Sequence, residues 1–196
     1  MAKERECAYD VEDMREAVNT MRNGGIILYP TDTVWGIGCD ATNEEAVSRI
    51  YKLKRREETK SMLVLVESVL KVKSYVGGIP DVGYDMMDIT DKPLTMILDG
   101  AKNLAKNLIA EDGSIGIRVT NEEFSHDLCY RLGKAIVSTS ANISGEPAAA
   151  IFSEISQEII DGVDYVVKYR QGDMRRAKPS SIVRLHNDGR VAIIRQ

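Results

Sequence analysis

The chain has 196 residues, of which 43% are apolar, and this suffices for one domain with a sizeable core. Acidic residues outnumber basic ones by 30 to 26, and the net charge of −4 argues against a protein that coats nucleic acid by bulk electrostatic attraction. The three cysteines, Cys7, Cys39 and Cys129, have no CxxC spacing, which argues against a disulfide framework or a zinc site.

The beginning of the chain carries no signal peptide, because residues 1–10 are charged and lack an apolar segment. No later run approaches the roughly 18 apolar residues that span a bilayer. Scattered, unpaired cysteines fit a reducing compartment. We therefore expect a cytoplasmic protein that does not associate with membranes.

The first half of the chain alternates between helical and strand-like patterns. Asp10 is a suitable N-cap for the first helix, and Gly24 ends it. Glu44 and Glu45 suit the first turn of a second helix. In chain order we expect a helix over 11–22, a strand over 26–29, extended structure over 36–40, a helix from about residue 43, a strand over 62–66 and a helix over 68–75.

The second half continues the alternation after a break at residues 77–80. It ends in a hairpin whose turn contains Asp188 and Gly189. The expected elements are strands over 94–98, 115–119 and 135–138, helices over 122–132 and 153–160, a strand over 165–167, and hairpin strands over 182–185 and 191–194. The fold class is therefore α/β, with a mixed sheet of about seven strands flanked by helices.

Two hydroxyl-rich segments follow predicted strands, PTDTVWG at residues 30–36 and STSANISGEP at 138–147. Polar side chains after buried strands need hydrogen-bond partners, which a ligand can supply, although turns and caps use the same residues. A cationic cluster lies between them, consisting of Lys52, Lys54, Arg55, Arg56 and Lys60. It can bind an anionic ligand or form a solvated helix end.

Neither of the two commonest backbone cradles for nucleotides, GxxxxGK[ST] and GxGxxG, occurs in the sequence. A nucleotide would therefore be held by side-chain cations. Arg56 offers a planar fork for phosphate oxygens, whereas Lys54 and Lys60 act as point charges.

Taken in order, the motifs resemble those of the YrdC/TsaC-type L-threonylcarbamoyladenylate synthase family. The resemblance covers nearly the whole chain, and its motifs are PTDTVWGIGCDATN from residue 30, YKLKRREETKSM from 51, SIGIRVT from 114, STSANISGEP from 138, PSSIV from 179 and the final Ile194-Arg195. It implies a twisted mixed sheet around a deep cavity. Residues 1–196 would form a single YrdC-like domain, the short form of the family.

The resemblance also implies an activity and substrates. Members of the family convert L-threonine, bicarbonate and ATP into threonylcarbamoyl-AMP and pyrophosphate, with Mg²⁺ normally accompanying the ATP. This is the first step of threonylcarbamoyladenosine modification of tRNA. Contacts with tRNA or with proteins of a transferase complex would then be possible.

Site roles follow from the same resemblance. The four catalytic positions of the family, Lys-Arg-Ser-Asn, correspond to Lys54, Arg56, Ser140 and Asn142. The residues implied for ATP are Arg56, Lys60, Ser114, Asn142, Ser181 and Arg195. The residues implied for threonine are Thr33, Arg118 and Ser140, and no residue is implied as a metal ligand. Lys54 and Arg56 are both expected to face the cavity.

Two other functions stay open at this point. One is a non-catalytic module that binds double-stranded RNA or tRNA, with Arg170, Arg175, Arg176 and Lys178 joining the cationic cluster on one face. The other is a related enzyme that handles a carbamoyl adenylate. Pyrophosphate release with threonine and bicarbonate, or with carbamoyl phosphate instead, separates these functions.

Overall fold

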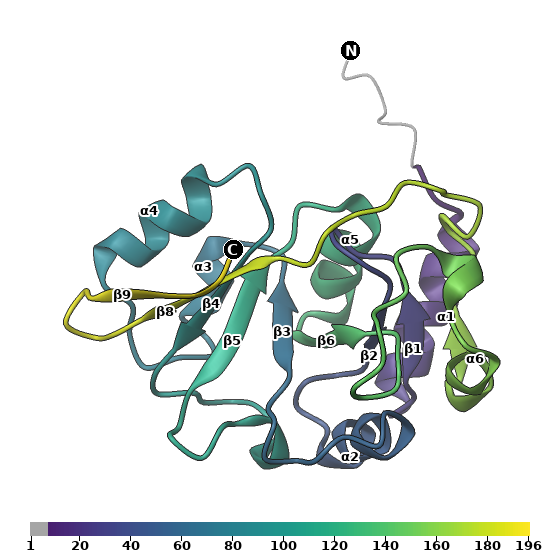
Figure 1. Cartoon of the computed structure of the whole chain (residues 1–196), viewed down its shortest axis with the longest axis horizontal. Coiled ribbons are helices and arrows are strands. Elements are labelled where there is room, and N and C mark those ends of the chain that lie inside the picture. Colours follow the sequence, from purple (N-terminus) through teal and green to yellow (C-terminus); the bar gives the residue numbers. More distant parts are fainter. Residues whose placement is uncertain (1–7) are drawn as a thin grey trace.

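Nine strands form one mixed sheet in the computed structural model, which describes residues 8–196 (Figure 1). Their order across the sheet is β7-β1-β2-β6-β3-β5-β4-β8-β9. The strands are β1 (Ile27–Tyr29), β2 (Gly36–Gly38), β3 (Leu63–Val66), β4 (Leu94–Leu98), β5 (Ile115–Val119), β6 (Ile136–Ser140), β7 (Tyr165–Val166), β8 (Ser181–Leu185) and β9 (Val191–Arg195).

The expectation of an α/β fold with a mixed sheet is confirmed, but the expected count of about seven strands was too low. Part of the difference lies at β2, where only extended structure was expected, because glycine occupies two of its three positions. Three strand pairs are parallel, namely β1–β7, β3–β5 and β4–β8, and the other five are antiparallel. The antiparallel β8–β9 hairpin lies where its turn residues predicted it.

Six α-helices and two short 3₁₀ helices connect the strands of the described chain. They are α1 (Val11–Arg22), α2 (Glu44–Leu53), α3 (Val69–Val72), α4 (Asp81–Ile89), α5 (Glu123–Leu132) and α6 (Gln157–Gly162), with 3₁₀ turns at Lys106–Leu108 and Phe152–Glu154. The expected cap is present, since the side chain of Asp10 accepts from the Glu12 N–H, and the side chain of Asn43 likewise accepts from the Ala46 N–H at the start of α2.

The helix α4 was not predicted. Pro80 immediately precedes it, and Gly83 lies within it and weakens its helical signal. Gly83 has a packing reason, because a Cβ at this position would lie 2.5 Å from Leu185 Cδ2 and 2.5 Å from Ile79 Cγ2. The absence of a side chain lets α4 approach β8 closely.

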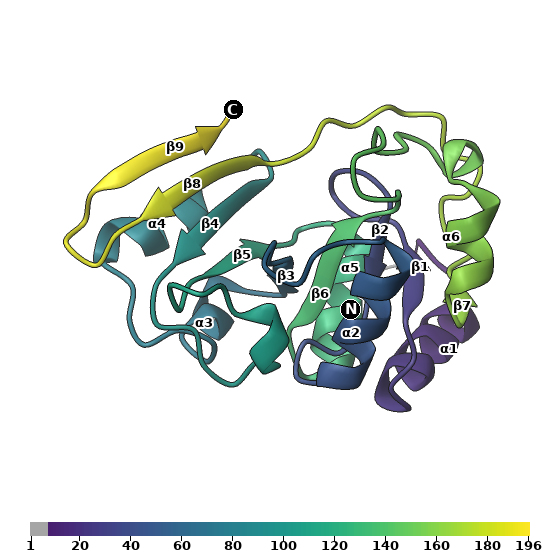
Figure 2. The same cartoon turned by 60° about the horizontal axis from the view of Figure 1, so that its bottom comes forward.

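The two faces of the sheet contribute to two separate buried apolar clusters. In β3, Val64 and Val66 belong to one buried cluster, which includes residues of α2, whereas Leu65 belongs to a second cluster with α1 and α5. Figure 2 shows α2 on one side of this part of the sheet and α5 on the other. The α1–α5 layer packs on β1 and β3 and does not extend over β4 and β8.

The face that carries Leu65 continues across the neighbouring strands by register. Arg118 of β5 pairs with Leu65, Thr95 of β4 pairs with Arg118, and Ile182 of β8 pairs with Thr95. Residues opposite one another in a sheet project from the same face. The part of this face beyond α5 therefore presents polar and charged side chains, and a cavity lies there.

Candidate active site

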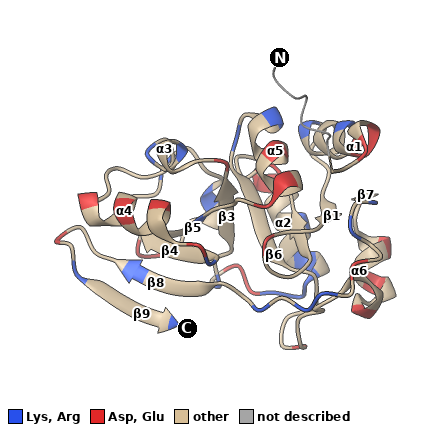
Figure 3. Cartoon of the chain, turned by 90° about the horizontal axis from the view of Figure 1, so that it is seen from above, with Lys and Arg blue, Asp and Glu red and all other residues tan. Residues whose placement is uncertain are grey.

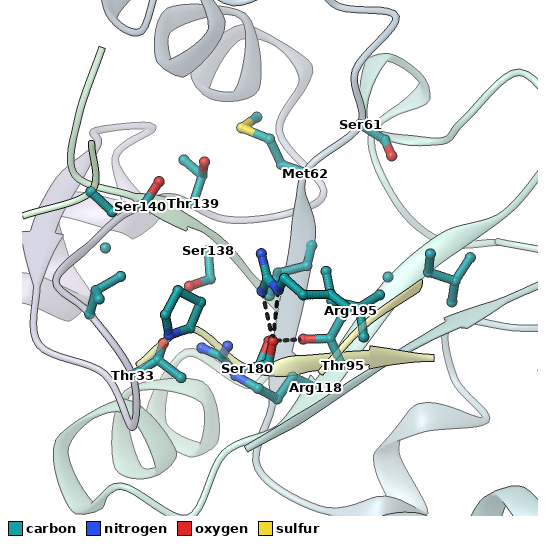
Figure 4. A pocket seen from close by; sticks show the side chains of 18 of the residues that line it. Thr33, Ser61, Met62, Thr95, Arg118, Ser138, Thr139, Ser140, Ser180 and Arg195 are labelled. Atoms are coloured by element: carbon teal, nitrogen blue, oxygen red, sulfur yellow. Dashed lines mark hydrogen bonds between the residues drawn. The ribbon is translucent and has the colours of Figure 1, made fainter. Parts of the chain in front are cut away.

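The cavity has a volume of about 410 Å³ and is walled by the sheet and by the loops around it (Figure 4). Its wall combines hydroxyls, arginines and apolar side chains. The lining residues are Thr33, Val34, Trp35, Gly36, Arg56, Ser61, Met62, Leu63, Thr95, Ile97, Ser114, Gly116, Arg118, Ser138, Thr139, Ser140, Ala148, Pro179, Ser180, Ile182, Arg184 and Arg195.

Strand β5 shows how the sequence builds this wall. Ser114, Gly116 and Arg118 line the cavity at every second position, while Ile115 and Ile117 between them are buried in the core on the other face. A Cβ at Gly116 would lie 3.3 Å from Leu63 Cβ and 3.4 Å from Thr95 Cγ2. The glycine thus leaves space in the middle of the wall.

Thr33 and Arg118 lie together on this wall, as expected from the sequence. Thr33 is held in a turn whose centre is the Thr31 hydroxyl, which accepts from the Thr33 N–H at 3.0 Å and donates to the Val34 carbonyl at 2.7 Å. Arg118 is only 3% exposed, and its Nη2 lies 3.0 Å from Oδ1 of Asp32. Burial raises the pKa of Asp32, and the positive charge of Arg118 partly offsets this effect.

The STSAN segment divides into residues that face the cavity and residues that do not. Ser138, Thr139 and Ser140 line it. Asn142 does not line it, because its Nδ2 donates to the carbonyls of Ile143 at 2.9 Å and Glu146 at 2.7 Å. Its Oδ1 is buried and has no hydrogen-bond partner among residues 8–196.

Lys54 was expected to face the cavity, and the structure corrects this expectation. The side chain is 1% exposed, and its Nζ donates to the carbonyls of Ser140 at 2.5 Å and Asn142 at 2.6 Å. The Ser144 N–H in turn donates to the Lys54 carbonyl at 2.9 Å. Burial, and to a smaller extent the positive charge of Arg56, lower the pKa of Lys54 to about 8. Lys54 therefore fastens the loop that carries Ser140.

Arg56 does line the cavity. Its Nε donates to the Lys60 carbonyl at 2.8 Å and its Nη2 to the Ser61 carbonyl at 2.9 Å. Arg55 adopts a left-handed conformation with φ of 50°, so that the side chains of Lys54 and Arg56 on either side of it point to different places. The Lys54 side chain points inward, and the Arg55 side chain pairs with Glu158 on the surface. Lys60 lies outside the cavity lining, and its Nζ is 3.1 Å from Oε2 of Glu57.

At the other end of the wall, Arg195 lines the cavity and Ser181 does not. The β8 residues that line it are Ile182 and Arg184, preceded by Ser180, so Ser181 projects from the opposite face. The Ser180 hydroxyl lies 2.8 Å from Oγ1 of Thr95, and its carbonyl accepts from Nε and Nη2 of Arg195 at 3.0 and 2.7 Å (Figure 4).

Ser114 lines the cavity as expected and is held by a carboxylate behind it. Its hydroxyl donates to Oδ1 of Asp112 at 2.6 Å, and Arg184 donates to Oδ2 of Asp112 at 2.8 Å and to Asp99 at 2.6 Å. These donors, Ser114 first, lower the pKa of Asp112 to about 2.

Four arginines line the cavity, and they differ in how their charge is balanced. Arg118 and Arg184 pair with carboxylates. Arg56 and Arg195 donate only to backbone carbonyls among the described residues and retain their full charge. No aspartate or glutamate is among the residues that line it. The cavity is therefore electropositive and suited to anionic ligands that also accept hydrogen bonds.

Thr95, Ser180 and Arg184 are among the lining residues to which the sequence assigned no role. The signal for Ser180 and Arg184 was the period of two along PSSIVRL, which becomes usable only when one residue of the strand is known to face the cavity. Thr95 is the polar position in an otherwise apolar strand segment, LTMIL. Such an interruption indicates a site rather than core.

The basic residues after β7 do not form a free cationic face. Figure 3 shows Lys and Arg along the segment that runs from β7 to β8. Arg170 lies 3.1 Å from Asp173, Arg175 lies 2.7 Å from the same carboxylate, and Arg176 pairs with Glu154. With Lys54 buried as well, the basic residues considered for an RNA-binding face do not gather as free charges.

Within residues 8–196, no group of three or more His, Cys, Asp or Glu side chains is arranged to hold a metal ion. None of the helices in this described part is both long and apolar enough to cross a membrane.

The fold and the arginine-lined cavity define an α/β protein with a site for anionic substrates, and comparisons with known proteins agree. The Sua5/YciO/YrdC family model, whose description is "Telomere recombination", matches residues 19–196. The Threonylcarbamoyl-AMP synthase of Idiomarina loihiensis is 33% identical over 174 residues, which cover 87% of this chain and 92% of that protein. This chain belongs to the Sua5/YciO/YrdC family.

Solved structures have the same fold. E. coli YciO is 25% identical with a TM-score of 0.81, and the match covers 93% of this chain and 88% of YciO. A crystal structure of P. abyssi Sua5 complexed with L-threonine is 21% identical with a TM-score of 0.79, over 88% of this chain and 50% of that one. This chain thus spans about half the length of P. abyssi Sua5.

Proposed function

We propose that this protein is a threonylcarbamoyl-AMP synthase, which forms threonylcarbamoyl-AMP from L-threonine, bicarbonate and ATP with release of pyrophosphate. The observation that carries the proposal is the cavity itself. It brings the hydroxyls of Thr33, Ser114 and Ser140 together with Arg56 and Arg195, within a family whose 33%-identical member is named for this activity.

The reaction requires no protein nucleophile. The neutral amine of threonine takes up bicarbonate with loss of water to give a carbamate, and a carbamate oxygen then attacks the α-phosphorus of ATP while pyrophosphate leaves. Catalysis rests on positioning and on charge stabilisation. Arg56 and Arg195 bind the phosphates, Ser114 joins them on the nucleotide side, and Arg118 binds the carboxylate of threonine beside Thr33 and Ser140.

Residues away from the cavity lining act indirectly in this proposal. Lys54 and Asn142 shape the loop that presents Ser140, through the Lys54 Nζ bonds and the Asn142 Nδ2 bonds. Lys60 ends the loop of Arg56 and supplies an exposed charge near it. In the PSSIV segment, Ser180 rather than Ser181 contributes a hydroxyl to the cavity wall.

The proposal includes Mg²⁺ as the companion of ATP. Mg²⁺ prefers carboxylate, water and phosphate oxygens, and no carboxylate lines the cavity. Such an ion would therefore be held by the triphosphate. The product would serve the modification of tRNA, by handover to tRNA or to proteins of a transferase complex, in the cytoplasm. Residues 1–196 would act as a single YrdC-like domain.

Pyrophosphate release by the purified protein with Mg²⁺-ATP tests the proposal, with threonine and bicarbonate each omitted in turn. Release should require both, and mass spectrometry should detect threonylcarbamoyl-AMP. Arg56→Gln should reduce the rate by about 100-fold, the order seen when one preorganised charge donor is lost. Arg55→Gln is the matched control, because Arg55 points to the surface and pairs with Glu158.

Other outcomes would assign the chain differently. Release that needs carbamoyl phosphate instead of threonine and bicarbonate would favour the related carbamoyl-adenylate chemistry. No release under any combination, together with salt-sensitive binding of double-stranded RNA, would favour a binding module. Equal rates for the Arg56→Gln and Arg55→Gln variants would overturn the site assignment.

A further inference from the structure

Asp32 lies directly behind the cavity wall, in the turn between β1 and β2. It does not line the cavity, but its Oδ1 is 3.0 Å from Nη2 of Arg118, which does. The two side chains are 13% and 3% exposed, respectively. A buried ion pair therefore stands behind one end of the cavity.

The position of the Asp32 carboxylate is set by the backbone. The Thr31 hydroxyl bridges the Thr33 N–H and the Val34 carbonyl, and Arg170 donates to the Thr31 carbonyl at 3.1 Å. Aspartate has a short side chain, so a fixed turn fixes its oxygens closely. The carboxylate is a rigid anchor rather than a flexible counter-ion.

Arg118 depends on this anchor. Its Nε is buried without a hydrogen-bond partner among the described residues, and Asp32 supplies the ion pair that the structure gives it. A buried guanidinium with no paired anion is strongly unfavourable. Without Asp32, Arg118 would turn toward the cavity to reach any anion there.

The arginines of the cavity are consequently unequal in net charge. Asp32 balances Arg118, whereas Arg56 and Arg195 donate only to carbonyls and keep a full positive charge each. A triphosphate carries several negative charges and is attracted to Arg56 and Arg195, whose charges no carboxylate balances. An amino acid is a zwitterion, and a half-neutralised arginine suits its single carboxylate.

We infer that Asp32 is a positioning and specificity residue of this site: it orients Arg118 for the carboxylate of the amino-acid substrate and keeps the triphosphate from pairing with Arg118. The inference rests on the proposed function and deepens it. It gives a role to the aspartate in the middle of the Thr-Asp-Thr turn.

Binding can be followed without turnover, because Trp35 is the single tryptophan of the chain and lines the cavity. Its fluorescence would be titrated with L-threonine, ATP and inorganic tripolyphosphate, using wild type, Asp32→Asn and Asp91→Asn. Asp91 is the matched control, since it is exposed and borders the same small neighbouring pocket of about 70 Å³ as Asp32.

Asp32→Asn should weaken threonine binding by about tenfold or more, because the buried guanidinium of Arg118 loses its paired carboxylate. Its ATP affinity should stay close to that of wild type. Tripolyphosphate should compete with threonine in the Asp32→Asn variant and not in wild type or Asp91→Asn. A merely structural role for Asp32 would not create this new competition.

Three results would overturn the inference. Equal threonine affinity in wild type and Asp32→Asn would remove the positioning role, and loss of both threonine and ATP binding would show that Asp32 supports the fold generally. Threonine binding weakened with no tripolyphosphate competition would remove the specificity role. A wild-type protein that binds ATP but never threonine would instead overturn the proposed function, so the two failures are distinguishable.

Discussion

Replacing Lys54 with methionine tests whether a buried ammonium holds the loop that carries Ser140. The change keeps a long unbranched side chain and removes the two hydrogen bonds from Nζ to the carbonyls of Ser140 and Asn142. A hydrogen bond to a charged group contributes about 1.5–3 kcal/mol, so the gross loss is about 3–6 kcal/mol.

Part of this loss is returned, because burial makes the charged form of Lys54 unfavourable. The pKa is lowered from 10.5 to about 8, and removing the charge returns on the order of 3 kcal/mol. The Lys54→Met variant should therefore lose at most about 3 kcal/mol of unfolding free energy at pH 7.

The pH dependence has a defined sign. Between about pH 8 and pH 10.5 the unfolded chain keeps the Lys54 proton and the folded protein has released it. Since the unfolded state then binds more protons, the stability of wild type rises with pH by up to about 1.4 kcal/mol per pH unit relative to Lys54→Met. The difference between the two proteins should widen as the pH is raised from 7 to 9.5.

Urea unfolding at several pH values, followed by circular dichroism, measures this difference. Lys52→Met is the matched control, because Lys52 is exposed in the last turn of the same helix. The reasoning would be refuted by a difference that stays constant with pH, or by Lys52→Met being as unstable as Lys54→Met.

Two further predictions concern the cavity wall. Arg195→Gln should weaken ATP binding about tenfold, because the charged guanidinium fork is lost. Arg190→Gln is the control, because Arg190 pairs with Asp188 instead. Equal ATP affinities of the two variants in an isothermal titration would contradict this prediction. Gly116→Val should place a branched side chain in the cavity and abolish binding of both ATP and threonine, whereas Gly116→Ala should weaken their binding only partly. Unchanged binding by the valine variant would show that ligands do not reach this part of the wall.

Local signals in the sequence were sufficient for much of the fold. Asp10 caps its helix as expected, and α2 begins near residue 43 as expected, because a cap needs only a short polar side chain next to an apolar periodic segment. The hairpin of β8 and β9 followed from its turn. Helix α4 was missed because its glycine serves contact with a distant strand.

The site was less accessible to such reasoning. Whether Ser180 or Ser181 faces the cavity depends on the phase of β8 against β4, and a shift by one residue exchanges the faces. Lys54 and Arg56 are separated by the left-handed Arg55, so two cations from one cluster point to different places. Neither the phase nor the turn is encoded in residues adjacent along the chain.

The order of the strands along the chain determines when, during synthesis, the cavity wall is complete. Strand β2 is synthesised before most of the other strands, β8 and β9 are synthesised after the other seven, and all three contribute to the wall of one cavity. A nascent chain that ends before residue 179 has Thr33, Arg118 and Ser140 but lacks the wall with Ser180 and Arg195. Substrates therefore cannot stabilise its partly made fold through that wall, and the long-range pairing of β4 with β8 is a slow, late event. The cavity has its complete wall only after the β8–β9 hairpin has been synthesised.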